Sequence, residues 1–243
     1  MEQLGFVGMP RRLFACTPSK LASFADCPRR YRMTYLDRPT PAKGPPWAHN
    51  ALGATVHNVL RAWWALPRRR RTPEASRAVL VGAWIPDGYR DGDQQRVMRE
   101  RAAGWIEDYL DTVDPDDEPV GLERVVAVKT ETLALSGRID RLDDRGGEPV
   151  VVDYKTGRAG LTEADAAGSQ ALALYALATA RTLRRPCRRV ELHHVSARGV
   201  YAHTHTDETL ARHLRRAEDA AADVLRAEQA LAGGASPDEA FPP

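Results

Sequence analysis

Apolar residues recur every three or four positions through most of the first half of the chain, a spacing typical of amphipathic helices. One helix is predicted to begin at Pro18 with Thr17 as its N-cap, and a second carries Tyr31 and Tyr35 one turn apart. A longer helix is predicted to begin at Gly53, and the helical patterns end before an acidic segment near residue 114. We therefore expect this half to be mainly helical.

After residue 121 the period changes from 3.6 to 2, which indicates β-strands. Residues 122–135 are predicted to form one long strand or a hairpin, and residues 137–142 a second strand. Residues 143–148 are rich in Asp and Gly and predict a tight turn, after which residues 150–154 form a short apolar strand. The alternation therefore predicts neighbouring strands that pair through this turn.

The remaining third of the chain mixes both patterns. Residues 169–183 are apolar almost all round, which predicts a buried crossover helix. Two strands are expected at 190–195 and 200–206, then a long amphipathic helix at 207–232, and the last residues resemble a frayed end. The order of elements predicts an α/β fold with a mixed central sheet flanked by helices and a helical N-terminal addition.

The length of 243 residues fits one large domain, and no break in composition divides it. We expect a single domain over residues 1–243. Residues 17–118 would form its mainly helical N-terminal part, and residues 119–232 its β-sheet core with the C-terminal helix.

The composition excludes several functions. The 35 basic and 33 acidic residues give a formal net charge of +2, which excludes a chain that coats nucleic acid through bulk charge. Only four residues are lysines and none follows a glycine, so a P-loop is excluded. No apolar run approaches the roughly 20 residues of a membrane span, the first residues do not resemble a signal peptide, and the odd number of cysteines disfavours disulfides. We expect a cytoplasmic protein that does not contact membranes.

The densest chemical pattern is an acidic residue on one predicted strand and an Asp-x-Lys triplet on the next. Asp153 and Lys155 lie two positions apart, so their side chains point to one face of the strand. If the strands pair through the turn, Asp140 comes close to Asp153, and the backbone carbonyl of Tyr154 adds an oxygen ligand. Such a site suits Mg²⁺ or Mn²⁺. The ammonium of Lys155 can hold an attacking water and stabilise the negative charge of phosphodiester attack.

An isolated Asp-x-Lys triplet is common, and a charged strand end at the surface is the alternative interpretation. Four segments in order favour the functional one. They are S-K-L-A-S-F-A-D-C-P-R-R-Y (19–31), G-A-T-V-H (53–57), G-R-I-D-R (137–141) and V-V-D-Y-K-T-G (151–157). Together they resemble the RecB-like branch of the PD-(D/E)XK nuclease superfamily, and the resemblance covers most of the chain.

The resemblance implies a role for each matching residue. Asp140 and Asp153 would be metal-binding and catalytic carboxylates, Lys155 the catalytic lysine, and His57 an additional metal ligand delivered from a helix. Glu123 lies where relatives often carry an acidic residue on the first strand. It could act as an accessory acid, but an exposed strand glutamate is an equally good interpretation.

The chain departs from the branch in three ways. Gln170 and Tyr175 are five residues apart where the branch has a spacing of four, so they do not share a helix face. Both are only weak candidates for substrate contact, Gln170 through a phosphate, and the core is the better expectation for Tyr175. Some relatives hold an iron–sulfur cluster on four cysteines, but only Cys187 follows Lys155, so no cluster is expected. The chain also lacks the helicase to which large RecB-type enzymes are fused, so it acts alone or with a separate helicase.

We therefore expect a divalent-metal-dependent DNA nuclease, of exonuclease type, that serves DNA repair, recombination or defence. Arg30 could contact phosphates and Tyr31 could stack on bases of single-stranded DNA or DNA ends. His203 and His205 share a strand face and could bind a metal, but the sequence shows no third ligand nearby. The alternative function is a DNA-binding subunit of a helicase–nuclease complex with little or no cleavage of its own.

Overall fold

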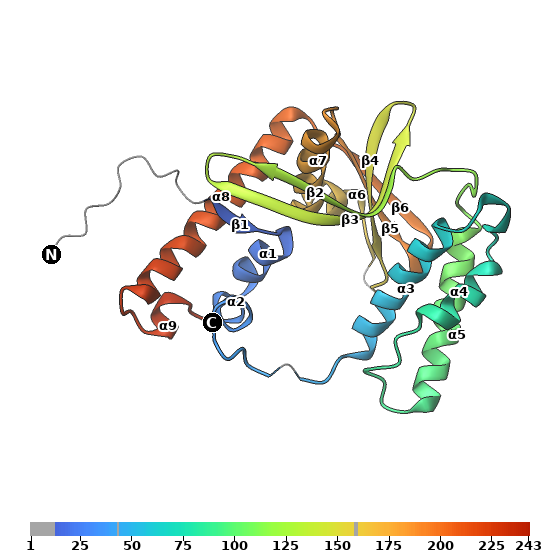
Figure 1. The fold of residues 1–243 in the computed structure, drawn as a ribbon, viewed down its shortest axis with the longest axis horizontal. Helices are drawn as coiled ribbons and strands as arrows, with labels where there is room; N and C mark the ends of the chain where they lie inside the picture. Colours follow the sequence, from blue (N-terminus) through green and yellow to red (C-terminus); the bar gives the residue numbers. More distant parts are fainter. Residues whose placement is uncertain (1–12, 43, 158–159) are drawn as a thin grey trace.

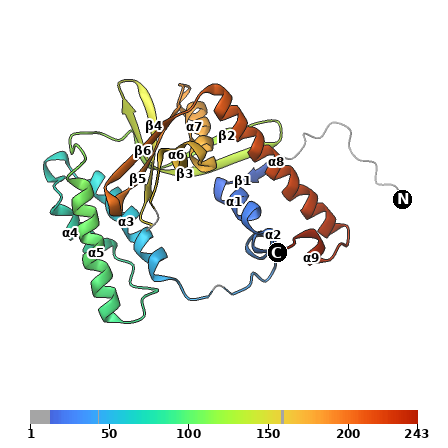
Figure 2. The ribbon, with the colours of Figure 1, turned by 180° about the vertical axis from the view of Figure 1, so that it is seen from behind.

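A six-stranded sheet lies at the centre of the protein, and helices cover both of its faces (Figures 1 and 2). The computed structural model describes residues 13–42, 44–157 and 160–243. The sheet contains parallel and antiparallel pairs, so the mixed α/β fold predicted from the sequence is confirmed. The strands are β1 (Phe14–Cys16), β2 (Gly121–Lys129), β3 (Leu133–Arg145), β4 (Glu148–Lys155), β5 (Arg189–His194) and β6 (Gly199–Thr204).

The long strand β3 organises the sheet. Along one edge it pairs with β2, and along the other it pairs with β1 near its start and with β4 near its end. Strand β5 lies parallel to β4, and β6 completes the sheet antiparallel to β5. The two parallel strands β4 and β5 are joined by helices α6 (Glu163–Gly168) and α7 (Gln170–Leu183), as a parallel connection requires.

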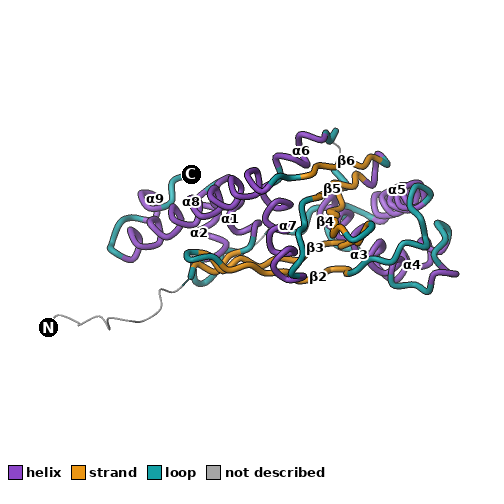
Figure 3. Tube along the Cα trace, turned by 90° about the horizontal axis from the view of Figure 1, so that it is seen from above, coloured by secondary structure: helices purple, strands orange, loops and turns teal. Residues whose placement is uncertain are grey.

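The helices form two groups, one against each face of the sheet. Figure 3 shows α3, α4 and α5 gathered at one end of the molecule and the long α8 beside α1, α2 and α9 at the other. Two apolar clusters correspond to these groups: Trp63, Ile106 and Val152 belong to the first, and Leu174, Val190 and Val224 to the second. The helices outside the crossover are α1 (Pro18–Asp26), α2 (Pro28–Tyr35), α3 (Ala48–Trp64), α4 (Ala75–Ala83), α5 (Gly92–Leu110), α8 (Asp207–Ala232) and α9 (Pro237–Ala240), with 3₁₀ turns η1 (Arg68–Arg70) and η2 (Val195–Ala197).

The structure decides between the alternatives for residues 122–135. They form a hairpin, because β2 ends at Lys129 and the chain turns at Thr130–Thr132 before β3 begins. The expected second strand at 137–142 is the continuation of β3. The hydroxyl groups of Thr130 and Thr132 donate to Glu218 of α8 at 2.8 and 3.0 Å, which fixes the tip of the hairpin to that helix.

The prediction of a frayed C-terminal end was wrong. Phe241 follows the short helix α9 and is fully buried, with its ring stacked on Tyr31 at a centroid distance of 6.1 Å. The capping box of Ser236 and Glu239 begins α9 and turns the chain back toward α2. Burial of a large aromatic ring stabilises this ending.

In the part of the chain that the structure describes, no helix is both long enough and apolar enough to cross a membrane.

Candidate functional site

The strongest candidate site lies where the pairing of β3 with β4 stops. The ladder runs as far as the pair Arg141 and Val152, and the same register would next place Asp140 opposite Asp153. Instead of a ladder bond, the backbone N–H of Tyr154 donates to Oδ2 of Asp140 at 2.9 Å. The strands therefore separate at these two residues, and both carboxylates lie at the opening.

Lys155 contacts the second carboxylate. Its Nζ lies 2.5 Å from Oδ2 of Asp153, as the two-residue spacing predicts. Burial raises the pKa of Asp153 above its usual value and the charge of Asp140 adds to this rise, while the positive charge of Lys155 opposes it. Two carboxylates and one lysine thus share one small region of partly buried charge.

His57 reaches the same region from α3. Gly53 lies one turn earlier, and a Cβ atom at that position would stand only 3.2 Å from the hydroxyl of Thr156, so the glycine lets α3 approach the end of β4. Nδ1 of His57 then lies 3.3 Å from Oδ2 of Asp140. Burial lowers the pKa of His57, but the hydrogen bond and charge of Asp140 outweigh it and leave the pKa raised.

His57 and Asp140 border a cleft of about 490 Å³, which we call the motif cleft because residues of two of the sequence motifs line it. Glu123 faces it from β2, where the register of the flanking pairs places it opposite Asp140. Its carboxylate is held by Nε of Arg138 at 2.7 Å, and its backbone has a φ of 49°, unusual for a residue other than glycine. The lining residues are Gly53, Ala54, His57, Asn58, Arg61, Glu123, Arg138 and Asp140.

Arg61 and Arg138 supply positive charge to this cleft and were not singled out by the sequence analysis. Arg61 lies one turn after His57 on α3, and Arg138 lies two residues before Asp140 on β3. Both are exposed and line the cleft. Helical and strand spacing from the two motif residues could have identified them, because those spacings place side chains on the same face.

The crossover helix contributes Tyr175 to this region, and Gln170 points elsewhere. The ring of Tyr175 packs over Gly137, where a Cβ atom would lie 2.3 Å from Cε1 of the ring. Burial raises the pKa of Tyr175, and the negative charges of Asp153 and Asp140 raise it further, so its phenol lies within their field. Gln170 bonds instead to His213 of α8, through its amide to the carbonyl and through Oε1 to Nδ1.

The two remaining substrate candidates lie apart from the cleft. Tyr31 is fully buried and donates a hydrogen bond to Glu228, so its ring presents no surface on which a base could stack. Arg30 is exposed and pairs with Asp26 one turn earlier on α1. Tyr31 is therefore a core residue, and Arg30 is a surface residue of the N-terminal helices.

The histidine pair at the end of β6, with His203 on the strand and His205 just after it, has a third histidine as a neighbour. The ring of His205 lies 4.6 Å from that of His203 and 5.4 Å from that of His213. Both ring nitrogens of His213 are engaged, however, one with Gln170 and the other with the carbonyl of Ala167. The trio is thus a packing cluster, and burial with the two neighbouring rings lowers the pKa of His205 to about 4.

The residues at the strand opening fit a divalent cation. Neighbouring ligands of an octahedral ion with metal–oxygen distances of 2.1 Å lie about 3 Å apart, close to the 3.3 Å between His57 and Asp140. Oδ2 of Asp153 is buried and, despite the nearby Lys155, accepts no well-aligned hydrogen bond from the described residues. Among the described residues, no group of three or more His, Cys, Asp or Glu side chains is placed closely enough to hold a metal ion.

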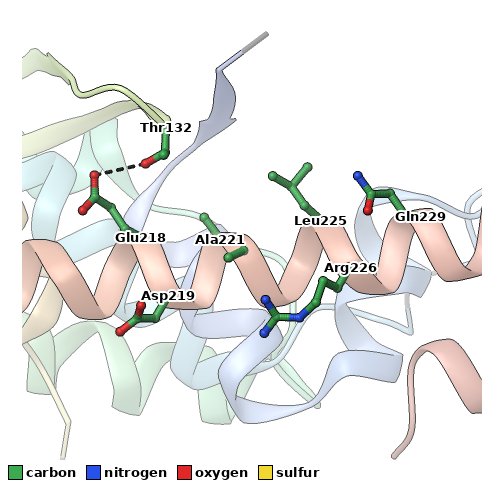
Figure 4. Close-up of a pocket in the computed structure, with 8 residues that line it drawn as sticks. Thr132, Glu218, Asp219, Ala221, Leu225, Arg226 and Gln229 are labelled. Carbon is green, nitrogen blue, oxygen red and sulfur yellow. Dashed lines mark hydrogen bonds between the residues drawn. The ribbon is translucent and has the colours of Figure 1, made fainter. Parts of the chain in front are cut away.

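A separate hollow runs along α8, beside the tip of the β2–β3 hairpin. Figure 4 shows the hydroxyl of Thr132 bonded to Glu218 at one end of it and Arg226 and Gln229 toward the other. It contains no residue of the four motifs, and Glu218 is already engaged by two threonines. We therefore assign the chemistry to the motif cleft.

The protein thus has a mixed sheet in which β3 and β4 separate at Asp140 and the Asp153-x-Lys155 triplet, and a helix brings His57 to the same place. This arrangement is that of a nuclease fold of the restriction-endonuclease type. The family model of the PD-(D/E)XK nuclease superfamily matches residues 15–242, so the chain belongs to that superfamily. A protein from Eubacterium rectale, provisionally described as an exonuclease, has a solved crystal structure with 11% identity and a TM-score of 0.49. That similarity covers 86% of this chain and 79% of the other. None of the curated proteins matches the sequence significantly.

Proposed function

We propose that the protein is a divalent-metal-dependent deoxyribonuclease of the RecB-like branch that acts as an exonuclease on DNA in repair, recombination or defence. The observation that carries the proposal is the meeting of His57, Asp140, Asp153 and Lys155, from three separate segments, at one strand opening. Membership of the superfamily supports phosphodiester hydrolysis as the reaction. A separate helicase could act as its partner.

The proposed ligands of Mg²⁺ or Mn²⁺ are His57, Asp140, Asp153 and the backbone carbonyl of Tyr154. A cation there supplies a Lewis acid that neutralises and polarises the phosphate. The backbone N–H of Tyr154 fixes one oxygen of Asp140, which leaves the orientation of that carboxylate set before any ligand binds. Glu123 is a proposed accessory acid.

Lys155 is the proposed catalytic residue for the water. Nearly half of its side chain is exposed, so its ammonium can reach a water in the cleft while Asp153 holds it in place. A positive charge at this point stabilises the negative charge that develops on the phosphate oxygens. Arg61 and Arg138 border the same cleft and are proposed to contact the flanking phosphates.

Cleavage assays with a chelator control test this function. Purified wild-type protein is incubated with labelled single-stranded, duplex and tailed DNA in Mn²⁺ or Mg²⁺, and cleavage is expected with either ion and not with EDTA. Lys155→Ala is expected to lower the rate about 10²- to 10³-fold, the usual cost of removing a group that stabilises charge in the transition state. Lys129→Ala, an exposed lysine at the end of β2, is the matched control and should cleave normally.

Full activity of Lys155→Ala would exclude the proposed mechanism. Metal-independent DNA binding without cleavage in any wild-type reaction would instead favour the DNA-binding subunit. The length and polarity of the products from end-labelled DNA decide between exonuclease and endonuclease action.

A further inference from the structure

A second, larger hollow adjoins the motif cleft on the other side of Gly53. It has a volume of about 720 Å³ and lies between the first turns of α3, helix α5 and the end of β4. Gly53 lines both hollows, and Thr156 and Gly157, which follow Lys155 in the chain, line the larger one. We call it the α3–α5 pocket. Its volume lies in the range of about 300–1,000 Å³ typical of pockets that hold small organic groups.

The walls of the α3–α5 pocket combine apolar surface with a few polar groups. Leu52, Met98 and Trp105 provide the apolar part, and Asn50 and Thr156 place hydrogen-bonding groups beside it. Arg101 adds a positive charge that forms no ion pair with any residue the structure describes, and its guanidinium donates a hydrogen bond to the sulfur of Met98 at 3.9 Å. A flat aromatic ring with polar edges and a nearby negative charge matches this lining.

An exposed tryptophan stands beside this pocket. Trp47 is the N-cap of α3 and precedes Ala48 and His49, which line the pocket, and 67% of its surface is exposed. Its ring meets that of His49 edge to face, with centroids 5.7 Å apart. Large aromatic side chains left on the surface next to positive charge are typical of proteins that stack on unpaired bases.

We propose that the α3–α5 pocket binds an unpaired base of the DNA strand whose neighbouring phosphodiester lies in the motif cleft. The base stacks on Trp105, its edge faces Asn50 and Thr156, and Arg101 contacts the adjoining phosphate. A paired base is covered by its neighbours and its partner, so only a single-stranded or frayed segment can enter. The substrate class that follows is single-stranded DNA or DNA with a single-stranded end, an inference that rests on the proposed function.

Binding without cleavage tests the pocket independently of catalysis. Fluorescence anisotropy in EDTA measures the affinity of the full-length protein for a labelled oligothymidylate and for a series with one abasic position moved along it. For the wild type, one position of the abasic site is expected to weaken binding about 5- to 150-fold, the range of one base–aromatic stack. The same abasic position should have no further effect in Trp105→Leu, which keeps an apolar side chain but cannot stack.

Two matched controls separate stacking from folding. Trp84 is a partly buried tryptophan of the same apolar cluster but does not line the pocket, so Trp84→Leu should keep the position-dependent loss. Arg101→Ala should weaken binding of every oligonucleotide, whereas Arg99→Ala, an exposed arginine two residues earlier on α5, should not. Because Trp47 is largely exposed, Trp47→Ala is expected to keep the fold, and it should weaken binding of every oligonucleotide if the strand also contacts the exposed ring beside the pocket.

Different results would contradict the pocket proposal and the nuclease proposal. The pocket proposal would be overturned by any of three results. The wild type could bind all abasic oligonucleotides equally, the Trp105 and Trp84 variants could behave alike, or single-stranded DNA could fail to bind. The nuclease proposal instead fails if the wild type binds in the expected manner but cleaves no DNA in Mn²⁺. If both hold, Trp105→Leu should raise KM for single-stranded DNA and leave kcat unchanged.

Discussion

Two groups of acidic side chains lie on the central strands, and arginines neutralise only one of them. At the strand opening, Asp140 and Asp153 contact a lysine, a histidine and one backbone N–H. The other group begins three residues further along β3, at Asp143. We call it the arginine-bonded network; it consists of Asp143 and Glu191 with Arg141, Arg145, Arg189 and His193.

The two groups differ in how many oxygen positions remain for a ligand. Arg141 and Arg145 each bond one oxygen of Asp143, at 2.6 and 3.1 Å, and Arg145 also spans both oxygens of Glu191. A guanidinium fork saturates a carboxylate in this way, and it cannot lose its proton to make room for a metal. Neighbouring cations, more than the number of carboxylates, thus determine whether an acidic group holds the fold together or binds a ligand.

The largest expected effect comes from removing one acid of each group. Asp143→Asn leaves Arg141 buried without its full counter-charge, and loss of one partner of a buried pair costs about 3–5 kcal/mol. Asp153→Asn should cost far less stability, because its Oδ2 accepts no well-aligned hydrogen bond from the described residues, yet it should abolish cleavage. Urea unfolding gives the loss of stability for both variants, and the cleavage assay gives their activity. Equal losses of stability would contradict the proposed difference between the two groups.

A divalent cation should stabilise the folded protein by binding at Asp140 and Asp153, and not at the arginine-bonded network. An ion present at 100 times its dissociation constant adds about 2.7 kcal/mol to the free energy of unfolding, which for a chain of this size raises Tm by roughly 5–10 °C. Differential scanning calorimetry with Mn²⁺ and with EDTA measures the shift. Asp140→Asn should remove it, whereas Asp144→Asn, an exposed aspartate on the same strand, should retain it. A shift that persists in Asp140→Asn would place the cation elsewhere.

A smaller effect is expected on the pH dependence of stability, through Glu191 of the arginine-bonded network. Burial alone would raise the pKa of Glu191, but hydrogen bonds from His193, Arg145 and Arg189 lower it from 4.5 to about 2. A carboxylate with a lowered pKa stabilises the fold above its unfolded pKa, and this contribution is lost as the pH falls from about 4.5 toward 2. Urea unfolding across this interval should show a steeper loss of stability for the wild type than for Glu191→Gln. Parallel pH curves would show that Glu191 does not titrate in this way.

The sequence predicted the residues of the strand opening because short-range geometry alone brings them together. Asp153 and Lys155 share a face through the two-residue period, and a hairpin returns β4 beside Asp140. The helical turn between Gly53 and His57 also follows from local spacing, although no local pattern explains why the first position is glycine. That reason is the hydroxyl of Thr156, which lies more than 100 residues away in the chain.

Contacts between distant segments were the part that could not be predicted. In the sequence, Tyr31 lies next to arginines and is a candidate for base stacking. Only its contacts with Phe241 and Glu228, about 200 residues later in the chain, show that it is a core residue. Trp105 is one apolar position among many on α5 until α3 and the end of β4 come to lie against it. Strand β1 has three residues, too few for any period to be detected.

Strand β3 carries one acid of each group, Asp140 and Asp143, so its alignment with β4 affects both groups. A shift of one residue in its pairing with β4 would turn every side chain to the opposite face, so that Arg141 would stand beside Asp153 in place of Asp140. The misaligned strand would also turn Arg145 away from Glu191 of β5, which it bonds at 2.7 and 2.8 Å, and Arg141 away from the ring of Trp64, whose centroid lies 3.9 Å from the guanidinium carbon. The bonds between Arg145 and Glu191 therefore favour the register of β3 in which Asp140 lies beside Asp153.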